Sequence, residues 1–175
     1  TIVGSSAARV SGCLCRSTII GSKAHHYLWG SEGDNTVVGF EGMYGFASGT
    51  VTAAYNTVMG SYAYKYSCTG SSNTIIGFCA GQGTSSGATG DFNVFMGRAS
   101  GLCLTSGTGN IFLGACAGNT NTSGSCNIAI GYDIELPSAT ANTQLVIGKG
   151  SSCWLCGDDS YHIKPGAGIR DTAGN

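Results

Sequence analysis

The chain has 175 residues, of which 30 are glycine and 2 are proline, and charged residues make up 10% of it. That share is well below the roughly 25% usual in soluble domains, so we expect part of the surface to pack against other chains. The net charge of −1 gives no electrostatic basis for binding nucleic acid or an anionic membrane, and no apolar run approaches the ~20 residues that span a bilayer.

One short motif, an aliphatic pair followed by glycine and usually preceded by asparagine and threonine, recurs along the chain. Its clearest copy is Asn73-Thr74-Ile75-Ile76-Gly77. Successive copies lie 17 to 21 residues apart, and a fixed period of this kind is the signature of a repeat architecture. The anchoring glycines are Gly4, Gly21, Gly39, Gly60, Gly77, Gly97, Gly114, Gly131 and Gly148.

Each copy reads as one short strand, because Ile, Val, Met, Leu and Phe suit a pleated, buried surface. One period covers roughly 56 Å when extended, which allows two short strands and two turns but no crossover helix. We therefore predict an all-β fold, a β-solenoid or β-roll of about nine coils with a period of about 17 residues. Stacked about 4.8 Å apart, the coils form a rod on the order of 40 Å long.

The first coils are less regular than the later ones. Residues 1–60 carry bulky side chains in the linkers at 25–29 and 43–46, whereas residues 61–148 keep the period closely. The bulky residues either fill a wider end of the roll or a seam between chains, or they form a binding loop on one face.

The period breaks near the C-terminus. We assign residues 1–148 to the solenoid and residues 149–175 to a C-terminal strap with a final strand or two, leading to a further domain. Thr1 falls inside a repeat and Asn175 follows no closing cap, so we expect the chain to be a fragment of a longer polypeptide.

An asparagine opens most copies of the motif, at the same position of each coil. Stacked asparagines can bond amide to amide from one coil to the next. The predicted ladder consists of Asn35, Asn56, Asn73, Asn93, Asn110 and Asn127.

Apolar residues occur on both faces of the predicted strands. Thr74 and Ile76 share one face, and Ile75 and Gly77 share the other. We expect the aliphatic pair before each glycine to form the core. A solitary solenoid exposes its outer face, so an apolar outer face predicts cover by a second copy of the chain.

Nine cysteines cannot all pair within one chain. Most are expected to be small buried side chains, with disulfides, some of them between chains, as the alternative. Cys153-Trp154-Leu155-Cys156 matches C-x-x-C, but no helical period surrounds it as a redox motif requires, and no second ligand pair stands at zinc spacing. His25 and His26 read as an exposed loop pair. We expect no metal and no cofactor.

Two acidic pairs, Asp133 with Glu135 and Asp158 with Asp159, have the residue types of a glycan-cleaving site. The linkers are too short to build the walls of a cleft, so we expect solvated turn residues and no enzymatic activity. Asn121-Thr122-Ser123 is a formal glycosylation sequon.

The repeats resemble the head-domain repeats of trimeric autotransporter adhesins and, more closely, those of tail fibres of marine bacteriophages. The resemblance rests on the pattern of residues 73–80 and 110–117, on residues 127–148, and on the run Ile163-Lys164-Pro165-Gly166-Ala167-Gly168-Ile169. It implies a homotrimeric fibre segment without cofactor, in a virion appendage or other extracellular fibre that reaches for a host glycan or receptor. The expected function is that of a rigid spacer.

Three alternatives remain open. A cellular trimeric adhesin head differs from a phage fibre in its flanking segments, and a glycan-cleaving tailspike would use the acidic pairs. An ice-binding solenoid would use the threonine column, which gives way to Val94 and Ile111 in later coils. Candidates for receptor contact are Tyr44, Tyr62, Tyr64 and Tyr66.

Overall fold

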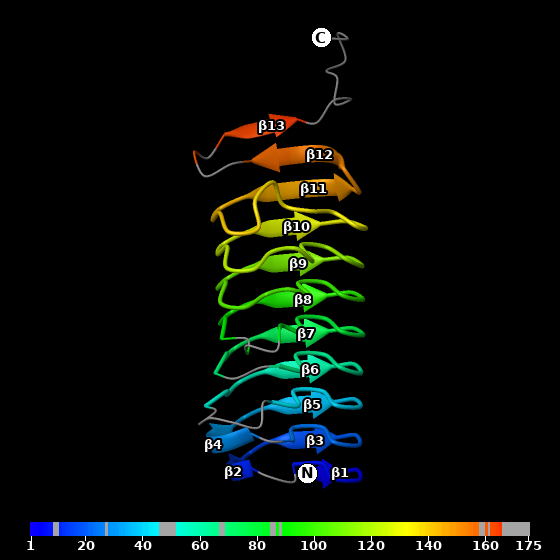
Figure 1. Cartoon of the computed structure of the whole chain (residues 1–175), viewed down its shortest axis with the longest axis vertical. Coiled ribbons are helices and arrows are strands. Elements are labelled where there is room, and N and C mark those ends of the chain that lie inside the picture. The colour runs from blue at the N-terminus through cyan, green and yellow to red at the C-terminus, as the bar shows by residue number, and fades with distance from the viewer. Residues whose placement is uncertain are drawn as a thin grey trace.

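The computed structural model describes residues 1–8, 11–26, 28–45, 52–66, 69–84, 87, 89–157, 160 and 162–165. Nine strands, one for each copy of the motif, stack in parallel into one sheet (Figure 1), and the predicted all-β solenoid is confirmed. These strands are β1 (Ile2–Val3), β3 (Thr18–Ile20), β5 (Thr36–Val38), β6 (Thr57–Met59), β7 (Thr74–Ile76), β8 (Val94–Met96), β9 (Ile111–Leu113), β10 (Ile128–Ile130) and β11 (Leu145–Lys149).

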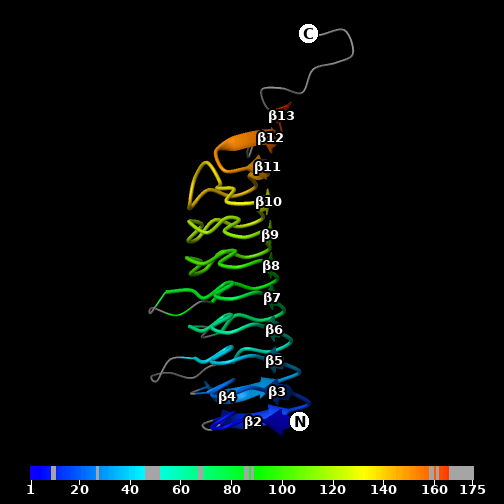
Figure 2. The same cartoon turned by 90° about the vertical axis from the view of Figure 1, so that its right-hand side faces the viewer.

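Equivalent residues of successive copies pair directly across the sheet. Between β6 and β7, for example, Val58 lies opposite Ile75, and the other parallel pairs keep the same register. Between β8 and β10 each coil leaves the sheet as a loop and returns to it as the next strand of the stack (Figure 2). Because the register never slips, every position of the motif becomes a continuous row along the rod.

Further strands lie at the two ends of this sheet. β2 (Ser11–Cys15) and β4 (Leu28–Gly33) pair in parallel as a second, two-stranded sheet in the first coils. At the other end β12 (Ser152–Gly157) runs antiparallel to β11, and β13 (Ile163–Pro165) runs antiparallel to β12. The predicted strap therefore begins with two strands that extend the sheet.

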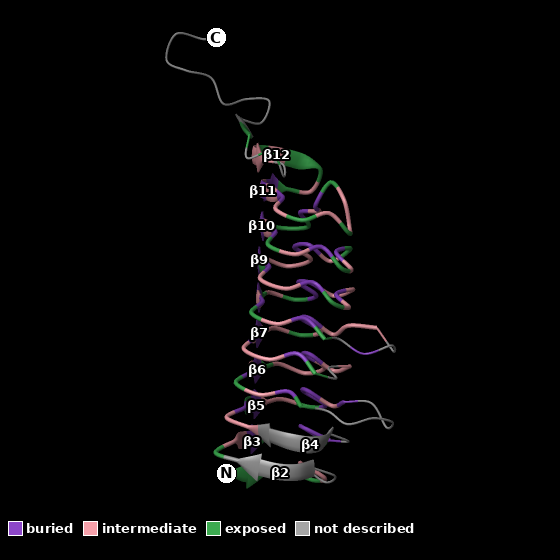
Figure 3. Cartoon of the chain, turned by 90° about the vertical axis from the view of Figure 1, so that its left-hand side faces the viewer, coloured by how far each residue is buried: buried purple, intermediate pink, exposed green. Residues whose placement is uncertain are grey.

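The core consists of the middle residue of each three-residue strand. These side chains are buried almost completely. The colouring in Figure 3 shows that buried residues recur from coil to coil along the rod. The prediction that both aliphatic residues before the glycine form the core is wrong for the second of them, because strand alternation turns it to the outer face. The core row is Ile19, Val37, Val58, Ile75, Phe95, Phe112, Ala129 and Val146.

Residues in the turn behind the sheet compensate for changes of volume in this row. Phe95 and Phe112 stack with ring centroids 5.0 Å apart, and each needs the glycine that faces it, because a Cβ at Gly101 or Gly118 would come 2.8 Å from the ring. Where the strand carries only Ala129, the same turn supplies the buried Ile134. The interior thus keeps a constant cross-section with varying sequence.

The turns depend on residues with left-handed backbone conformation. The second residue after each anchoring glycine has φ between +49° and +59° in the described coils, in most of them without being glycine. Left-handed conformation in a non-glycine residue costs about 1 kcal/mol, so the stacking around these turns must outweigh it. The non-glycine residues at this position are Ser6, Lys23, Glu41, Tyr62, Cys79, Ala99, Cys116 and Asp133.

Candidate functional surfaces

The six predicted asparagines form a hydrogen-bonded ladder inside the rod. Asn93 shows the pattern: its backbone N donates to Asn73 Oδ1 at 2.8 Å, and its Nδ2 donates to the same oxygen at 3.1 Å. Nδ2 also donates to the carbonyl oxygen of Gly107 in the following coil at 3.0 Å. All six side chains are buried, so each rung satisfies backbone groups that water cannot reach.

The ladder ends at Gln144, which occupies the asparagine position of the last copy. Its backbone N still donates to Asn127 Oδ1 at 2.8 Å. Its longer side chain folds back on its own loop, where Oε1 accepts from Ser138 N at 2.9 Å and Nε2 donates to Ser138 O at 2.8 Å. Gln144 therefore continues the ladder as a donor, whereas its own side-chain oxygen Oε1 accepts from its own loop and not from a following coil.

The anchoring glycines stack backbone on backbone. A Cβ built on Gly97 would overlap the carbonyl oxygen of Gly114, and from Gly4 to Gly114 each anchoring glycine meets the next one in this way. From Gly4 to Gly131 these residues also have φ between +128° and +143°. The motif requires glycine for both reasons.

The outer face of the sheet is apolar along most of its length. The residue directly before each anchoring glycine points outward, and Met59 and Met96 are 43% and 42% exposed. In the other outward row Thr18, Thr36, Thr57 and Thr74 pair in register from β3 to β7. From β8 onward the same row holds Val94, Ile111, Ile128 and Leu145.

The four candidate tyrosines have different environments. Tyr64 is buried, and its hydroxyl donates to Gly90 O at 3.2 Å and accepts from Asn73 Nδ2 at 3.0 Å, so its proposed receptor contact is wrong. It lies inside the coil because its turn position is one that faces the core. Tyr44, Tyr62 and Tyr66 are partly exposed.

These three tyrosines surround one cation. Lys65 Nζ lies 4.8 Å from the ring centroid of Tyr62, and 5.8 Å and 5.3 Å from those of Tyr44 and Tyr66. It also pairs with Glu41 at 2.9 Å. Burial acts to lower the pKa of Lys65, but the hydrogen bond and charge of Glu41 outweigh it and leave the pKa above its usual value.

Sequence reasoning missed two phenylalanines beside this cluster. Tyr62 makes edge-to-face contacts with Phe40 and Phe78, with ring centroids 5.3 Å and 5.8 Å apart. We call Phe40, Tyr62 and Phe78 the aromatic corner. The signal in the sequence is that both phenylalanines directly follow an anchoring glycine, where the intervening coil has the small Ser61.

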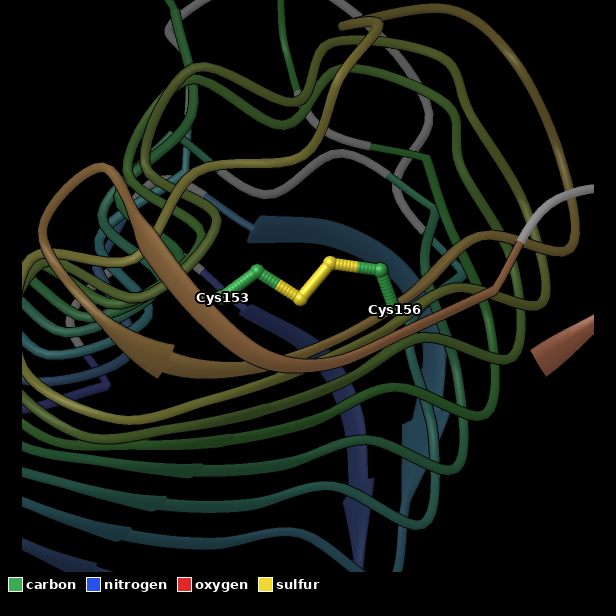
Figure 4. Close-up of a disulfide and its surroundings, with 2 residues drawn as sticks. All are labelled: Cys153 and Cys156. Carbon is green, nitrogen blue, oxygen red and sulfur yellow. A yellow bond between two sulfur atoms is a disulfide. The ribbon is translucent and has the colours of Figure 1, made fainter. Parts of the chain in front are cut away.

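Cys153 and Cys156 form a disulfide within β12 (Figure 4). Residues three apart in a regular strand point to opposite faces, but Trp154 is an additional residue in the pairing of β12 with β11, between partners of Gly148 and Ile147. This bulge turns both cysteines to the core side and brings their Cα atoms to 6.1 Å. Trp154 itself is 59% exposed.

Four other cysteines whose side chains the structure describes are not the buried side chains that we expected. Cys79, Cys103 and Cys116 are half-buried and Cys126 is exposed, because they occupy turn positions instead of the core row. Burial raises the pKa of the Cys79 thiol despite the nearby charges of Lys65 and Arg98, which disfavours the reactive thiolate.

Burial corrects one other sequence expectation and also describes the asparagine of the sequon. His25 and His26 are buried and not an exposed pair, because they occupy turn positions that face the core, and His26 stacks on Tyr44 with centroids 5.3 Å apart. Asn121 of the sequon is also buried, and its Nδ2 donates to Gly124 O at 3.0 Å.

Of the two acidic pairs, the structure describes only Asp133 and Glu135. Asp133 is exposed in a turn, and Glu135 accepts a hydrogen bond from the backbone N of Thr120 at 3.3 Å. The buried Ile134 lies between them. Asp158 and Asp159 lie outside the described residues.

Among the described residues, no three His, Cys, Asp or Glu side chains are grouped so as to hold a metal ion. The same residues contain no helix capable of crossing a bilayer. Comparison with family models, with curated proteins and with solved structures finds no match for this chain.

Proposed function

We propose that the chain is a structural segment of an extended fibre, in which several copies pack through the outer face of the sheet. The observation that carries this proposal is the apolar outer row. An exposed apolar strip running along nine strands is a surface that monomers rarely leave open to water. Burying this strip between copies would remove from water the apolar surface that a chain with few charged residues otherwise exposes.

The coil-to-coil bonding suits the role of a stiff spacer. Adjacent coils are bonded through the sheet and through the described turns, and from Asn35 to Gln144 they are also bonded through the asparagine ladder. The short turns of the described coils leave few sites for a protease, and coils bonded in this way keep the two ends of the rod at a fixed distance.

The resemblance of the repeats to phage tail-fibre repeats supports a virion appendage, extracellular, homotrimeric, that holds a host-attachment element away from the particle. A cellular trimeric adhesin is the alternative. The segments flanking this chain distinguish the two, because an adhesin carries a membrane anchor and a fibre carries a virion-attachment domain.

Native mass measurement tests the proposal. We expect an oligomer, with three times the mass of the chain for a trimer. Met96→Lys should dissociate it, because the substitution places a charge in the outer apolar row that the copies would bury between them. Tyr55→Lys is the matched control, because Tyr55 is exposed but lies outside the sheet. A parent chain that is monomeric at micromolar concentration would contradict the proposal.

One observation favours a second candidate, ice binding. The threonines of β3 to β7 form a regular row on a flat sheet face. The two functions compete for that face, since a face covered by a second copy cannot meet ice. Thermal hysteresis of the purified chain would identify ice binding, and its absence together with an oligomeric mass would favour the fibre.

A further inference from the structure

The aromatic corner presents rigid ring surfaces to solvent. Phe40 and Phe78 are 38% and 51% exposed, two coils apart, with Tyr62 filling the space between them. The Lys65 ammonium lies over the Tyr62 ring at 4.8 Å from its centroid and pairs with Glu41 at 2.9 Å. The rings therefore lose little conformational entropy when a ligand stacks on them.

Positive charge is concentrated around this corner. Lys23 and Lys65 both approach Glu41, at 3.5 Å and 2.9 Å, so one carboxylate faces two ammonium groups. Arg98 occupies the position of Phe78 one coil later, and its Nη2 donates to Cys116 Sγ at 3.5 Å. Three cations against one anion contrast with the net charge of −1 of the whole chain.

We propose that the aromatic corner binds an anionic polysaccharide. The apolar faces of its sugar rings stack on Phe40 and Phe78, and its carboxylate or sulfate groups pair with Lys23 and Arg98. Rings with flanking cations suit this ligand because it is apolar on one face and charged at its edge. The binding role goes beyond the spacer and does not require that the chain form an oligomer.

Charge favours this occupant over a second copy of the chain. The same corner of another copy carries the same excess of positive charge, so a symmetric contact between the two corners would be repulsive. The apolar outer row of the sheet provides the surface for self-association, and the aromatic corner lies in the turns that follow the sheet.

Binding to three immobilised probes tests the proposal: heparin, which is sulfated, polygalacturonate, which is carboxylated, and neutral dextran. We expect the full chain to bind at least one anionic probe and not dextran. Phe78→Ala and Arg98→Ala should each weaken binding roughly threefold to tenfold, the loss of one stacking or charged contact.

The chain offers matched controls at the same position of later coils. Tyr132 and Lys149 also follow anchoring glycines and are exposed, but they lie outside the corner. Tyr132→Ala and Lys149→Ala should leave affinity unchanged. If Phe78→Ala fails to fold, Phe78→Leu removes the ring face while keeping its bulk.

Each outcome is decisive for the corner. Equal binding of dextran, or loss of binding with Arg98→Ala but not with either Phe78 variant, overturns the proposal, the second because it shows a general charge effect. A change of native mass with Phe78→Ala but not with Tyr132→Ala also overturns it, because the corner would then be a subunit contact. A monomeric parent that binds polygalacturonate or heparin through Phe78 refutes the fibre and supports the corner.

Discussion

At the scale of single residues, two positions define the repeat. The anchoring glycine permits backbone stacking between coils, and the asparagine forms hydrogen bonds inside the rod. The glycine is present in all nine copies, whereas the asparagine position holds Ser17 in the second copy and Gln144 in the last. Glycine is required by a carbonyl group in the adjacent coil, and asparagine by two backbone groups and a neighbouring amide. Their effects on stability can be separated by substitution.

Glycines of this chain should differ sharply in how much stability is lost when each is replaced by alanine. Gly97→Ala places a Cβ against the Gly114 carbonyl, and we expect it to destabilise the fold by more than about 4 kcal/mol or to prevent folding. Gly109→Ala also creates a left-handed alanine, but its Cβ meets only Cys126 Sγ at 3.7 Å. That change should cost about 1 kcal/mol in urea unfolding. Equal losses would show that backbone conformation, and not stacking, explains the motif.

An interior rung of the ladder should be costly to remove. Asn110→Ala deletes the donor to Gly124 O and leaves the buried backbone N of Asn127 without its acceptor. We expect a loss of about 2 to 3 kcal/mol in thermal or urea unfolding. Asn119→Ala, in a partly exposed turn, serves as control and should change stability by less than about 0.5 kcal/mol. Unchanged stability of Asn110→Ala would refute a stabilising ladder.

At the scale of elements, the nine strands of the repeat could be predicted from the sequence, whereas β2, β4 and the turns could not. Each strand is marked by three residues and a glycine, so its position follows directly. The burial of His25 and Tyr64 was missed because the turn position that they share carries glycine in later coils, as at Gly101 and Gly118. Aligning the coils at their glycines would have shown this exchange of volume.

β12 packs against the C-terminal end of the core, and we call it the cap. Its disulfide could not be predicted from the sequence either. A bulge depends on pairing with β11, and C-x-x-C spacing alone gives no sign that Trp154 is additional in that pairing. Sequence reasoning therefore weighed redox and zinc chemistry, whereas the structure shows a disulfide that packs against the end of the core.

Reduction should loosen this cap without unfolding the rod. The bridge closes a short segment, so we expect the Cys153→Ala/Cys156→Ala variant to lose about 1 to 2 kcal/mol. Hydrogen exchange should rise in β12 and remain slow in β7 to β9. The disulfide assignment would be contradicted if a proteolytic peptide that contains both cysteines, prepared without reducing agent, carried free thiols.

At the scale of the whole molecule, the rod is a sum of nearly equivalent coils that contact their neighbours. Its length is set by the number of coils and not by any single contact. The outer apolar row and the aromatic corner both follow from the constant register, because residues at the same position of successive coils line up into one surface.

Removing one whole coil should therefore leave a folded rod. Deletion of residues 98–114 joins Gly97 to Ala115 and brings β8 beside β10 with the register intact. We expect native-like circular dichroism and a particle shorter by about 4.8 Å in small-angle scattering. Deletion of residues 98–106 breaks the register and should prevent folding. Equal disruption by both deletions would argue against independent coils.

The asparagine ladder also gives the molecule a direction. The peptide hydrogen bonds between strands alternate: Thr18 N donates toward the following coil and Ile19 N toward the preceding one, so their dipoles largely cancel. The side-chain carbonyls of the ladder do not alternate, since each accepts from the coil that follows it. Aligned amides of this kind sum to an axial field, as in a helix, that draws anions to one end and cations to the other. Two such rods placed side by side would attract when antiparallel and repel when parallel, so in a parallel bundle the apolar contact must overcome that opposition.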